Sequence, residues 1–164
     1  AFALVCKQYP ELKLHIIGDG NQRTNLEKLI DTLHMRDSIT ITGMLDRNEV
    51  RCSLWQADAF ILTSHYEGWG LVFIEALASG LPVITTKVGC VDEVLKPHKT
   101  ALIIEKSDPE NVQKTIQFAI QNQKIMQQYA HSGQQLIMKK YSKDKLLSQW
   151  VNLLQETKRE YAKN

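Results

Sequence analysis

Cysteine is scarce in this sequence, and the three cysteines, Cys6, Cys52 and Cys90, lie far apart. They show neither the CxxC spacing of a zinc site nor the even number that a disulfide framework needs. The five histidines also lack the spacing of metal ligands, so no metal site is expected. Scattered cysteines are typical of a reducing compartment, and we therefore expect a cytoplasmic protein, at most associated with the inner face of the membrane.

Charge of one sign and long apolar runs are lacking too. The 20 basic and 18 acidic residues are mixed along the chain and give a net charge of +2, so no nucleic-acid partner is expected. No apolar run approaches the ~20 residues that cross a bilayer, and no signal peptide is recognisable. Repeats, low-complexity tracts and flexible linkers are absent as well, so the 164 residues are predicted to form one domain.

The sequence does contain a series of short apolar runs separated by amphipathic stretches. Runs rich in Val, Ile and Leu predict strands at residues 12–17, 39–42, 59–63, 82–86 and 101–104. They show little clean alternation of polar and apolar residues, which favours strands covered by helices on both faces. Strands that alternate with helices in this way are typical of an α/β domain with a parallel sheet.

The amphipathic stretches predict the helices. After the first strand, one apolar stripe is formed by Leu26, Leu29, Ile30 and Leu33. Residues 46–56 predict a shorter helix, and Asp108 followed by Pro109 predicts the N-cap and first residue of a later one. The chain is expected to be helical from there to its end.

The last helix is predicted to begin after Ser142 as its cap, with a buried stripe formed by Leu146, Leu147, Trp150, Val151 and Leu154. Trp55 and Trp150 are expected to anchor the core from their helices. Residues 1–9 have the apolar pattern of the second half of a helix. This beginning indicates a segment of a longer chain.

The most informative stretch is residues 64–94, SHYEGWGLVFIEALASGLPVITTKVGCVDEV. It follows the predicted strand that ends near Thr63, and Gly68-Trp69-Gly70 then opens a helix that is expected to run to Ser79. The free amides of a helix N-terminus, placed at the carboxyl ends of the strands of an open α/β sheet, form a site for anions. A diphosphate fits such a place.

Two carboxylates, Glu67 and Glu75, flank the start of this helix. Glu75 is surrounded in sequence by Val72, Phe73, Ile74, Ala76, Leu77 and Ala78, so we expect it to be buried. A buried carboxylate needs hydrogen-bond donors. The two hydroxyls of a ribose would supply them, and so would a lysine or a backbone amide inside the fold. The residues alone leave both interpretations open.

Residues 64–94 resemble the donor-site signature of retaining glycosyltransferases of the GT-B architecture, the glycosyl transferases group 1 family, which have two Rossmann-like domains. That signature is a Glu, a Gly-aromatic-Gly turn, a second Glu eight positions after the first, and a small-residue stretch before Pro-Val. Every element is present, as Glu67, Gly68-Trp69-Gly70, Glu75-Ala76, Ala78-Ser79-Gly80, Leu81, Pro82 and Val83. Further resemblances lie at Ile17-Gly18-Asp19-Gly20, Ile41-Thr42-Gly43 and Ala57-Asp58-Ala59.

The resemblance implies that residues 1–164 form the C-terminal, nucleotide-sugar-binding domain, an α/β Rossmann-like fold with a doubly wound parallel sheet and a helical C-terminal segment. Glu67 would contact the transferred sugar and is the catalytic candidate, and Glu75 would bind the ribose. Backbone amides of the turn and of the first helical residues would hold the diphosphate or the sugar, at Gly68, Trp69, Gly70, Leu71 and Val72. Gly43, Met44 and Leu45 would lie along the base, and Gly18, in the family's glycine turn after a strand, is a further donor-binding candidate.

Two departures from the family pattern stand out. Cys90 replaces the second glycine that relatives carry after Val88-Gly89. The family's first strand, with the Arg and Lys that neutralise the leaving diphosphate, has no counterpart. In the strand order 3-2-1-4-5-6 that strand is central, so the strands at 12–17 and 59–63 would lose their shared neighbour. An isolated fragment is therefore expected to be poorly stable or rearranged, and inactive.

The implied function is transfer of a sugar from a UDP- or GDP-sugar to a glycan or lipid acceptor with retention of configuration, in cell-envelope or exopolysaccharide synthesis. No cofactor beyond this donor is expected. The absent N-terminal domain would bind the acceptor and supply any peripheral membrane contact. A sugar-nucleotide epimerase of the same architecture and a non-catalytic nucleotide-binding module are the alternatives. A nicotinamide or flavin site is not expected, because Arg23 replaces the third glycine of the fingerprint that Gly18-Asp19-Gly20 begins.

Overall fold

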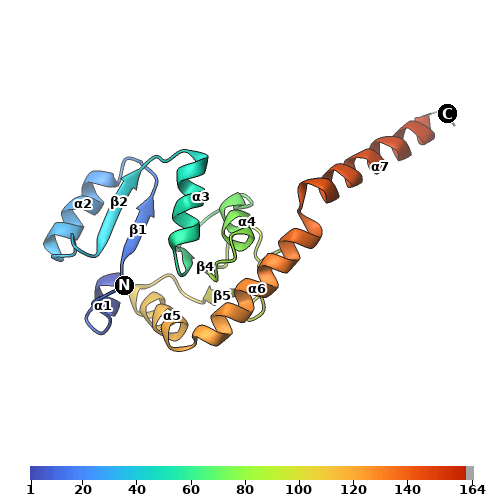
Figure 1. The fold of residues 1–164 in the computed structure, drawn as a ribbon. Coiled ribbons are helices and arrows are strands. Elements are labelled where there is room, and N and C mark those ends of the chain that lie inside the picture. The colour runs from blue at the N-terminus through green and yellow to red at the C-terminus, as the bar shows by residue number, and fades with distance from the viewer. Residues whose placement is uncertain (162–164) are drawn as a thin grey trace.

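Helices and strands alternate along the chain, as the sequence predicts (Figure 1). The computed structural model describes residues 1–161. The strands are β1 (Leu14–Ile17), β2 (Ile39–Gly43), β3 (Phe60–Leu62), β4 (Val83–Thr86) and β5 (Ala101–Ile104). The helices are α1 (Phe2–Cys6), α2 (Arg23–Thr32), α3 (Arg47–Gln56), α4 (Leu71–Ala78), α5 (Pro109–Gln121), α6 (Gln123–Lys140) and α7 (Lys143–Tyr161). All five predicted strands are confirmed, with small shifts at their ends.

The strands are all paired in parallel, but they form two separate sheets. β1 pairs with β2 over Leu14↔Ile39 to Ile17↔Gly43, and the second sheet has the order β3-β4-β5. Among residues 1–161, no strand joins β1 to β3. The sheet is divided at the position where, from the sequence, the central strand of the doubly wound order is expected to be missing.

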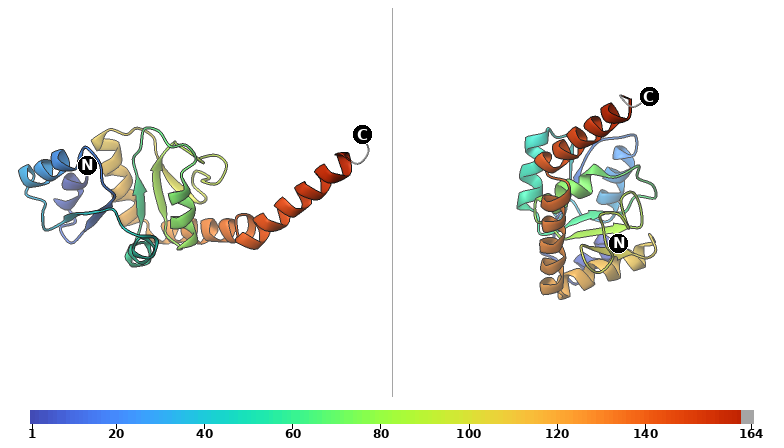
Figure 2. Two further views of the ribbon diagram at one scale, coloured as in Figure 1. Left: turned by 90° about the horizontal axis from the view of Figure 1, so that it is seen from above. Right: turned by 90° about the vertical axis from the view of Figure 1, so that its right-hand side faces the viewer.

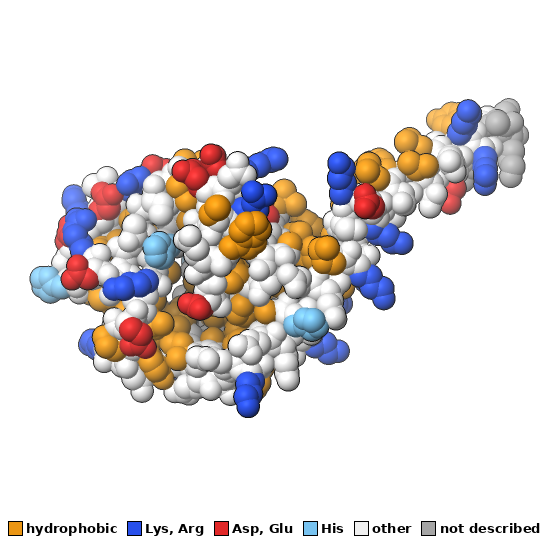
Figure 3. Space-filling model, in the orientation of Figure 1, with side chains coloured by type: hydrophobic (Ala, Val, Ile, Leu, Met, Phe, Trp, Pro, Cys, Tyr) orange, Lys and Arg blue, Asp and Glu red, His pale blue; other side chains and the backbone are white. Residues whose placement is uncertain are grey.

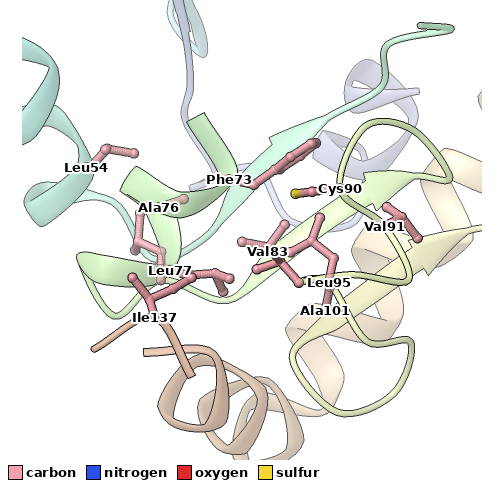
Figure 4. Close-up of a cluster of buried hydrophobic side chains, with 12 residues drawn as sticks. Leu54, Phe73, Ala76, Leu77, Val83, Cys90, Val91, Leu95, Ala101 and Ile137 are labelled. Atoms are coloured by element: carbon pink, nitrogen blue, oxygen red, sulfur yellow. The ribbon is translucent and has the colours of Figure 1, made fainter. Parts of the chain in front are cut away.

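Both faces of the larger sheet are covered, because successive residues of its strands point to opposite sides. Val83 and Ala101 face a cluster with residues of α4 and α6, while Ile84 and Leu102 face a second cluster with residues of α5 and α6. Figure 4 shows the first cluster, and the left view of Figure 2 places these strands between α4 and α5. The four residues of β4 are accordingly all buried, which explains why the strand shows no alternation in sequence.

Side chains cap the starts of α3 and α5, and the cap at Asp108 is predicted from the sequence. The Asp46 side chain accepts hydrogen bonds from the amides of Asn48 and Glu49, and the Glu49 carboxylate accepts one from the Asp46 amide. This reciprocal arrangement is a capping box. Asp108 caps α5 by accepting from the Asn111 amide at 2.9 Å, and Pro109 is the first helical residue.

The predicted burial of the last helix is wrong. α7 extends away from the body of the molecule (Figure 1). Its apolar side chains line one exposed face (Figure 3). Its exposed residues include the whole predicted stripe, Leu146, Leu147, Trp150, Val151 and Leu154. Periodicity identifies an apolar face of a helix, but it does not show what covers that face.

Other predicted core residues are exposed as well. Trp55 and Trp150 have 63% and 62% of their surface exposed, so neither anchors the core of the described chain. Of the predicted stripe on α2, only Ile30 is buried. None of the helices within residues 1–161 combines the length and the apolar character needed to cross a membrane.

Candidate functional site

The predicted glycine turn lies at the carboxyl edge of the larger sheet. β3 ends at Leu62, the turn follows, and α4 begins at Leu71. The Thr86 hydroxyl, at the carboxyl end of β4, donates a hydrogen bond of 2.6 Å to the Ser64 carbonyl oxygen. The loop that leads into the turn is therefore fixed at the edge where ligands of open α/β sheets bind.

Gly70 makes the sharp entry into α4. It is the N-cap residue in the left-handed conformation, with φ at +79°, and the Phe73 amide donates to its carbonyl oxygen at 3.0 Å. A Cβ on Gly70 would stand 2.6 Å from the Phe73 ring, so only glycine fits here. The first amides of a helix have no acceptor within the helix, and the N–H groups of Leu71 and Val72 accordingly face outward from the start of α4.

Glu67 is half-buried beside the turn and accepts a hydrogen bond of 2.9 Å from the Ser64 hydroxyl. This hydrogen bond fixes one carboxylate oxygen, Oε1. Behind it lies Gly89, with φ at +60°, where a Cβ would meet the Trp69 carbonyl oxygen at 2.8 Å and the Glu67 Cβ at 3.2 Å. The loop at Gly89 thus packs directly against the backbone of the turn.

The replacement of the second family glycine by Cys90 is compatible with this packing. The Cys90 amide donates to the Trp69 carbonyl oxygen at 3.0 Å, while its side chain points into the buried cluster around Phe73 (Figure 4). Burial in this cluster raises the pKa of the Cys90 thiol above its ordinary value. Cys90 therefore serves as a small apolar residue that closes the cluster beneath the turn.

The side chain of Trp69 is held by two residues that are distant in the sequence. Its indole Nε1–H donates to the Glu93 carboxylate at 2.9 Å, and its ring lies 5.9 Å from the Tyr141 ring at an angle of 56°. Trp69 is 37% exposed, whereas at Gly68 beside it no atom lies within 4 Å of the place that a Cβ would take. The turn is thus open on the Gly68 side and anchored through Trp69.

Glu75 does not have the predicted environment. It is exposed, and no hydrogen bond or salt bridge to its carboxylate occurs within residues 1–161. Leu71, Glu75 and Ala78 form the exposed face of α4, whereas Phe73, Ala76 and Leu77 are buried. The expectation that Glu75 is buried is wrong, because the apolar residues around it divide between a buried and an exposed face.

The second group of candidate residues lies at the carboxyl ends of β1 and β2. The Gly18 amide donates to the Gly43 carbonyl oxygen at 2.9 Å, and both glycines have positive φ, at +133° and +75°. Met44 is 78% exposed and Leu45 is half-buried. The structure therefore brings Gly18 and Gly43 together, next to Met44 and Leu45.

The side chains of Asp19 and Arg23 lie beside this second group of residues. Arg23 Nη1 lies 2.9 Å from Asp19 Oδ2 and 3.0 Å from the place of a Cβ on Gly43. The Gly20 amide and the Arg23 side chain, by donating to Asp19, lower the pKa of its carboxyl below the ordinary value. Within residues 1–161, no hydrogen bond or salt bridge connects this group to the glycine turn at residues 67–70.

Sequence reasoning missed the residues that support the turn. They are Ser64, Thr86, Glu93 and Tyr141. No pattern around Glu93 or Tyr141 distinguishes them from ordinary loop and helix residues, because each contacts Trp69 only through the tertiary fold. No three His, Cys, Asp or Glu side chains of residues 1–161 are placed to hold a metal ion.

Two hollows on the surface are lined by other residues than those of the predicted site. One of about 480 Å³ is lined by residues of α6 and of the loop before β5, including Lys96, His98 and Tyr129. The other, of about 580 Å³, lies at the corner between α6 and α7 and includes Tyr141. Residues 67–70 of the glycine turn line neither of them.

Comparison with known proteins gives a consistent assignment. The sequence model of the family described as "Glycosyl transferases group 1" matches residues 1–136. The N-acetyl-alpha-D-glucosaminyl L-malate synthase of Bacillus anthracis is 26% identical over 98% of this chain and 41% of its own length. The 2-deoxystreptamine N-acetyl-D-glucosaminyltransferase of Niallia circulans is 31% identical over 62% of this chain and 26% of its own. The chain thus spans less than half the length of these relatives.

Solved structures show the same fold. The C-terminal domain of a glycosyl transferase group 1 family protein from Francisella tularensis superposes with a TM-score of 0.77 at 25% identity, over 86% of this chain and 75% of that one. A sucrose-phosphate synthase from Thermosynechococcus elongatus superposes with a TM-score of 0.82 at 23% identity, over 97% of this chain and 42% of that one. The α/β, Rossmann-like fold predicted from the sequence is confirmed.

Proposed function

The chain belongs to the glycosyl transferases group 1 family, and from this premise we propose that it is the donor-binding half of a retaining glycosyltransferase. The reaction is transfer of a sugar from a nucleoside-diphosphate sugar to a glycan or lipid acceptor. The residues concerned are those of the C-terminal, nucleotide-sugar-binding domain, 1–164.

The observation that carries this proposal is the start of α4 at the carboxyl edge of the sheet. There Gly70 turns the chain so that the amides of Leu71 and Val72 lie at the positive end of the helix dipole. In a glycosyl transfer, negative charge develops on the leaving diphosphate while the sugar becomes oxocarbenium-like. Amides that are already oriented stabilise that negative charge without further rearrangement.

The two carboxylates beside this anion site, Glu67 and Glu75, differ in their burial and in their hydrogen bonds. Glu67, half-buried and fixed by Ser64, is the candidate to contact the hydroxyls of the transferred sugar and to face its developing positive charge. Glu75 is exposed and free of partners among the described residues, so both of its oxygens are available to the two hydroxyls of a ribose. Gly18, Gly43, Met44 and Leu45 are the candidates to lie along the nucleotide base and the donor.

Retention of configuration allows two routes that use the same residues. Glu67 is the candidate nucleophile by its position, and displacement on one face of the sugar, with the phosphate assisting the acceptor, is the other route. No metal or separate cofactor is required in either, because the helix amides take the role of a cation at the diphosphate.

The names of relatives support a choice of donor. The Bacillus anthracis and Niallia circulans relatives are an N-acetylglucosaminyl malate synthase and an N-acetylglucosaminyltransferase. A solved pneumococcal O-GlcNAc transferase of 21% identity and the same fold is described in complex with UDP and GlcNAc. A UDP-sugar is therefore our first choice of donor and a GDP-sugar the second. A relative that builds a lipopolysaccharide core and one that glycosylates poly(ribitol-phosphate) support a role in the cell envelope.

We propose a second half that completes the enzyme and binds the acceptor. The exposed apolar face of α7 supports it, since apolar surface of this kind marks an interaction site. Peripheral contact with the inner face of the cytoplasmic membrane would come through that half. The fragment alone is expected to be inactive.

Calorimetric titration of the full-length protein with UDP, GDP and ADP, followed by their sugars, tests the proposal. We expect binding of UDP or GDP, sugar transfer to an added acceptor, and a product whose anomeric configuration matches the donor by NMR. A product formed without acceptor would favour the epimerase. A protein that binds the donor but neither transfers nor hydrolyses it would be a binding module.

A further inference from the structure

We propose that Glu93 and Tyr141 are positioning residues that hold the Trp69 indole and so fix the donor turn for binding. This inference rests on the proposed function, because it gives the role of residues that support the site of that function. The two side chains lie in different parts of the chain, Glu93 in the loop after β4 and Tyr141 at the end of α6.

The turn needs such support because of its composition. Gly68 and Gly70 lie on either side of Trp69, and glycine restricts the backbone less than any other residue. No atom lies within 4 Å of a Cβ position on Gly68, so no side chain packs against this side of the turn. Trp69 is the one residue of Gly68-Trp69-Gly70 with a side chain through which the fold can hold the turn.

Trp69 is held by its backbone and by its side chain. Its carbonyl oxygen accepts from the Cys90 amide at 3.0 Å, and its indole Nε1–H donates to the Glu93 carboxylate at 2.9 Å. Both partners belong to the same loop, which also packs against the turn at Gly89. A hydrogen bond to an ionised acceptor is stronger than one between neutral groups, so Glu93 contributes orientation even at an exposed position.

Tyr141 holds the indole ring from the other direction. Its ring centre lies 5.9 Å from that of Trp69 at an angle of 56°, within the range of favourable aromatic pairs. Tyr141 packs against the cluster beneath α4, and its amide donates to the Ile137 carbonyl oxygen at 2.8 Å. The ring is thus fixed by the body of the fold, and it links the donor turn to the corner from which α7 departs.

Fixing the turn matters for binding because amides that are already in place need no ordering when the diphosphate arrives. If Trp69 were released, the turn would sample other conformations. Only the fraction with the correct geometry would then bind, so the apparent affinity for the donor would fall in proportion. The rate of the chemical step in the bound complex would change less.

The test compares variants of the full-length protein. Glu93→Ala and Tyr141→Ala should each raise the donor KM and the Kd for UDP about threefold to tenfold while kcat changes less than about twofold. Glu93→Gln and Tyr141→Phe are the matched controls. Because they keep an acceptor oxygen and an aromatic ring, both should restore most of the affinity.

Two further measurements separate positioning from general stability. A variant that only loses folded protein lowers kcat and leaves KM unchanged. In NMR spectra, the indole N–H of Trp69 should be protected from exchange in the wild type and lose this protection in Glu93→Ala, with or without nucleotide. The double variant Trp69→Phe/Glu93→Ala should have the same Kd for UDP as Trp69→Phe alone. The hydrogen bond from the indole N–H to Glu93 is already lost in Trp69→Phe.

The outcomes are distinct. Unchanged KM and Kd in both alanine variants, with a wild type that binds UDP, would overturn this inference and leave the proposed function standing. Additive effects of Glu93→Ala and Trp69→Phe would overturn it as well. A wild type that binds no nucleotide would remove the proposed function and this inference with it.

Discussion

The ring of Phe73 occupies the place next to Gly70 where a side chain would begin. Phe73 Cδ2 and Cε2 both lie 2.6 Å from the position of a Cβ on Gly70, whose φ is +79°. Phe73 itself is fully buried and makes an edge-to-face contact with Phe60, with ring centres 6.2 Å apart. The core of the sheet therefore determines the shape of the turn at the start of α4.

Gly70→Ala should destabilise the protein and weaken nucleotide binding together. An alanine would meet the Phe73 ring and would have to adopt a left-handed conformation, which costs about 1 to 3 kcal/mol of folding free energy. Urea unfolding and titration with UDP measure the two effects. Gly68→Ala is the control, because nothing lies within 4 Å of its Cβ position and little loss of stability is expected. Equal stability of Gly70→Ala and the wild type would contradict the fit between Gly70 and Phe73.

Gly133→Ala should also destabilise the protein, although alanine favours a helix. A Cβ at Gly133, on α6, would stand 2.4 Å from Leu77 Cδ2, and both residues are buried. The gain in helix propensity is about 1 kcal/mol, whereas overpacking a core costs about 1 to 3 kcal/mol, so a net loss follows. Urea unfolding midpoints measure this loss.

Adding Leu77→Val to Gly133→Ala tests the cause. The shorter side chain removes the clash, so the double variant should be more stable than Gly133→Ala alone. If the two changes simply add, α4 and α6 do not meet at these residues. Gly20→Ala, at a position with open space around it, should change the midpoint little.

Acid should remove the contribution of the Asp108 cap. The Asn111 amide, and then the Asn111 side chain, donate to Asp108 and lower its carboxyl pKa. A carboxyl group whose pKa is lower in the folded than in the unfolded protein stabilises the fold when it is ionised. This stabilisation is complete above the pKa of the unfolded state, about 3.9, and disappears as the pH falls through the lower pKa of the folded state. Asp108→Ala should therefore lower the melting temperature at pH 7, and this difference should shrink below about pH 4.

The control for the cap is Asp58→Ala, which removes an exposed carboxylate outside any helix. Such a surface substitution should change stability by less than about 0.5 kcal/mol. A difference between Asp108→Ala and the wild type that is the same at pH 7 and at pH 3 would show that the charge of Asp108 does not stabilise α5.

The sequence predicts the strands and the capped helices well because their signals are local. Asp46 and Asp108 each accept from amides two or three residues further along the chain, so a short stretch contains the whole interaction. All four residues of β4 are buried because both faces of the strand are covered, and the absence of alternation in sequence is itself the signal. The turn at Gly70 is recognisable for the same reason.

The burial of α7 and the support of Trp69 are not predictable in this way. Trp150 lies on a regular apolar stripe. The same stripe would appear in a helix that packs in the core and in a helix whose apolar face is exposed. Tyr141 and Glu93 reach Trp69 from distant parts of the chain, and no spacing rule connects them. Such contacts depend on the tertiary structure, in which side chains from separate elements meet.

Glu75 shows how a correct motif can accompany a wrong environment. The apolar residues on both sides suggest that it is buried, yet Leu71 and Ala78 share its exposed face. Burial therefore no longer supports a role in binding ribose, and the argument for that role now rests on the position of Glu75 one turn into α4. A direct test of Glu75 is accordingly the most informative experiment on this site.

Glu75→Ala should reduce the affinity for UDP without affecting stability. Because the side chain is exposed and makes no hydrogen bond or salt bridge among residues 1–161, the unfolding free energy should change by less than about 0.5 kcal/mol. A carboxylate that accepts from a ribose hydroxyl contributes about 1.5 to 3 kcal/mol, which corresponds to a tenfold or greater rise in the Kd for UDP. Glu156→Ala, on the exposed surface of α7, is the control and should leave the Kd unchanged.

The ligand provides the second half of this experiment. In the wild type, 2′-deoxy-UDP should bind more weakly than UDP, because one hydroxyl partner of Glu75 is missing. In Glu75→Ala the two ligands should bind almost equally, since a hydroxyl without its acceptor contributes little. If the preference for UDP over the deoxy ligand persists in the variant, another residue binds the ribose. An unchanged Kd for UDP itself would remove Glu75 from the site, while the amides at the start of α4 would remain candidates for the diphosphate.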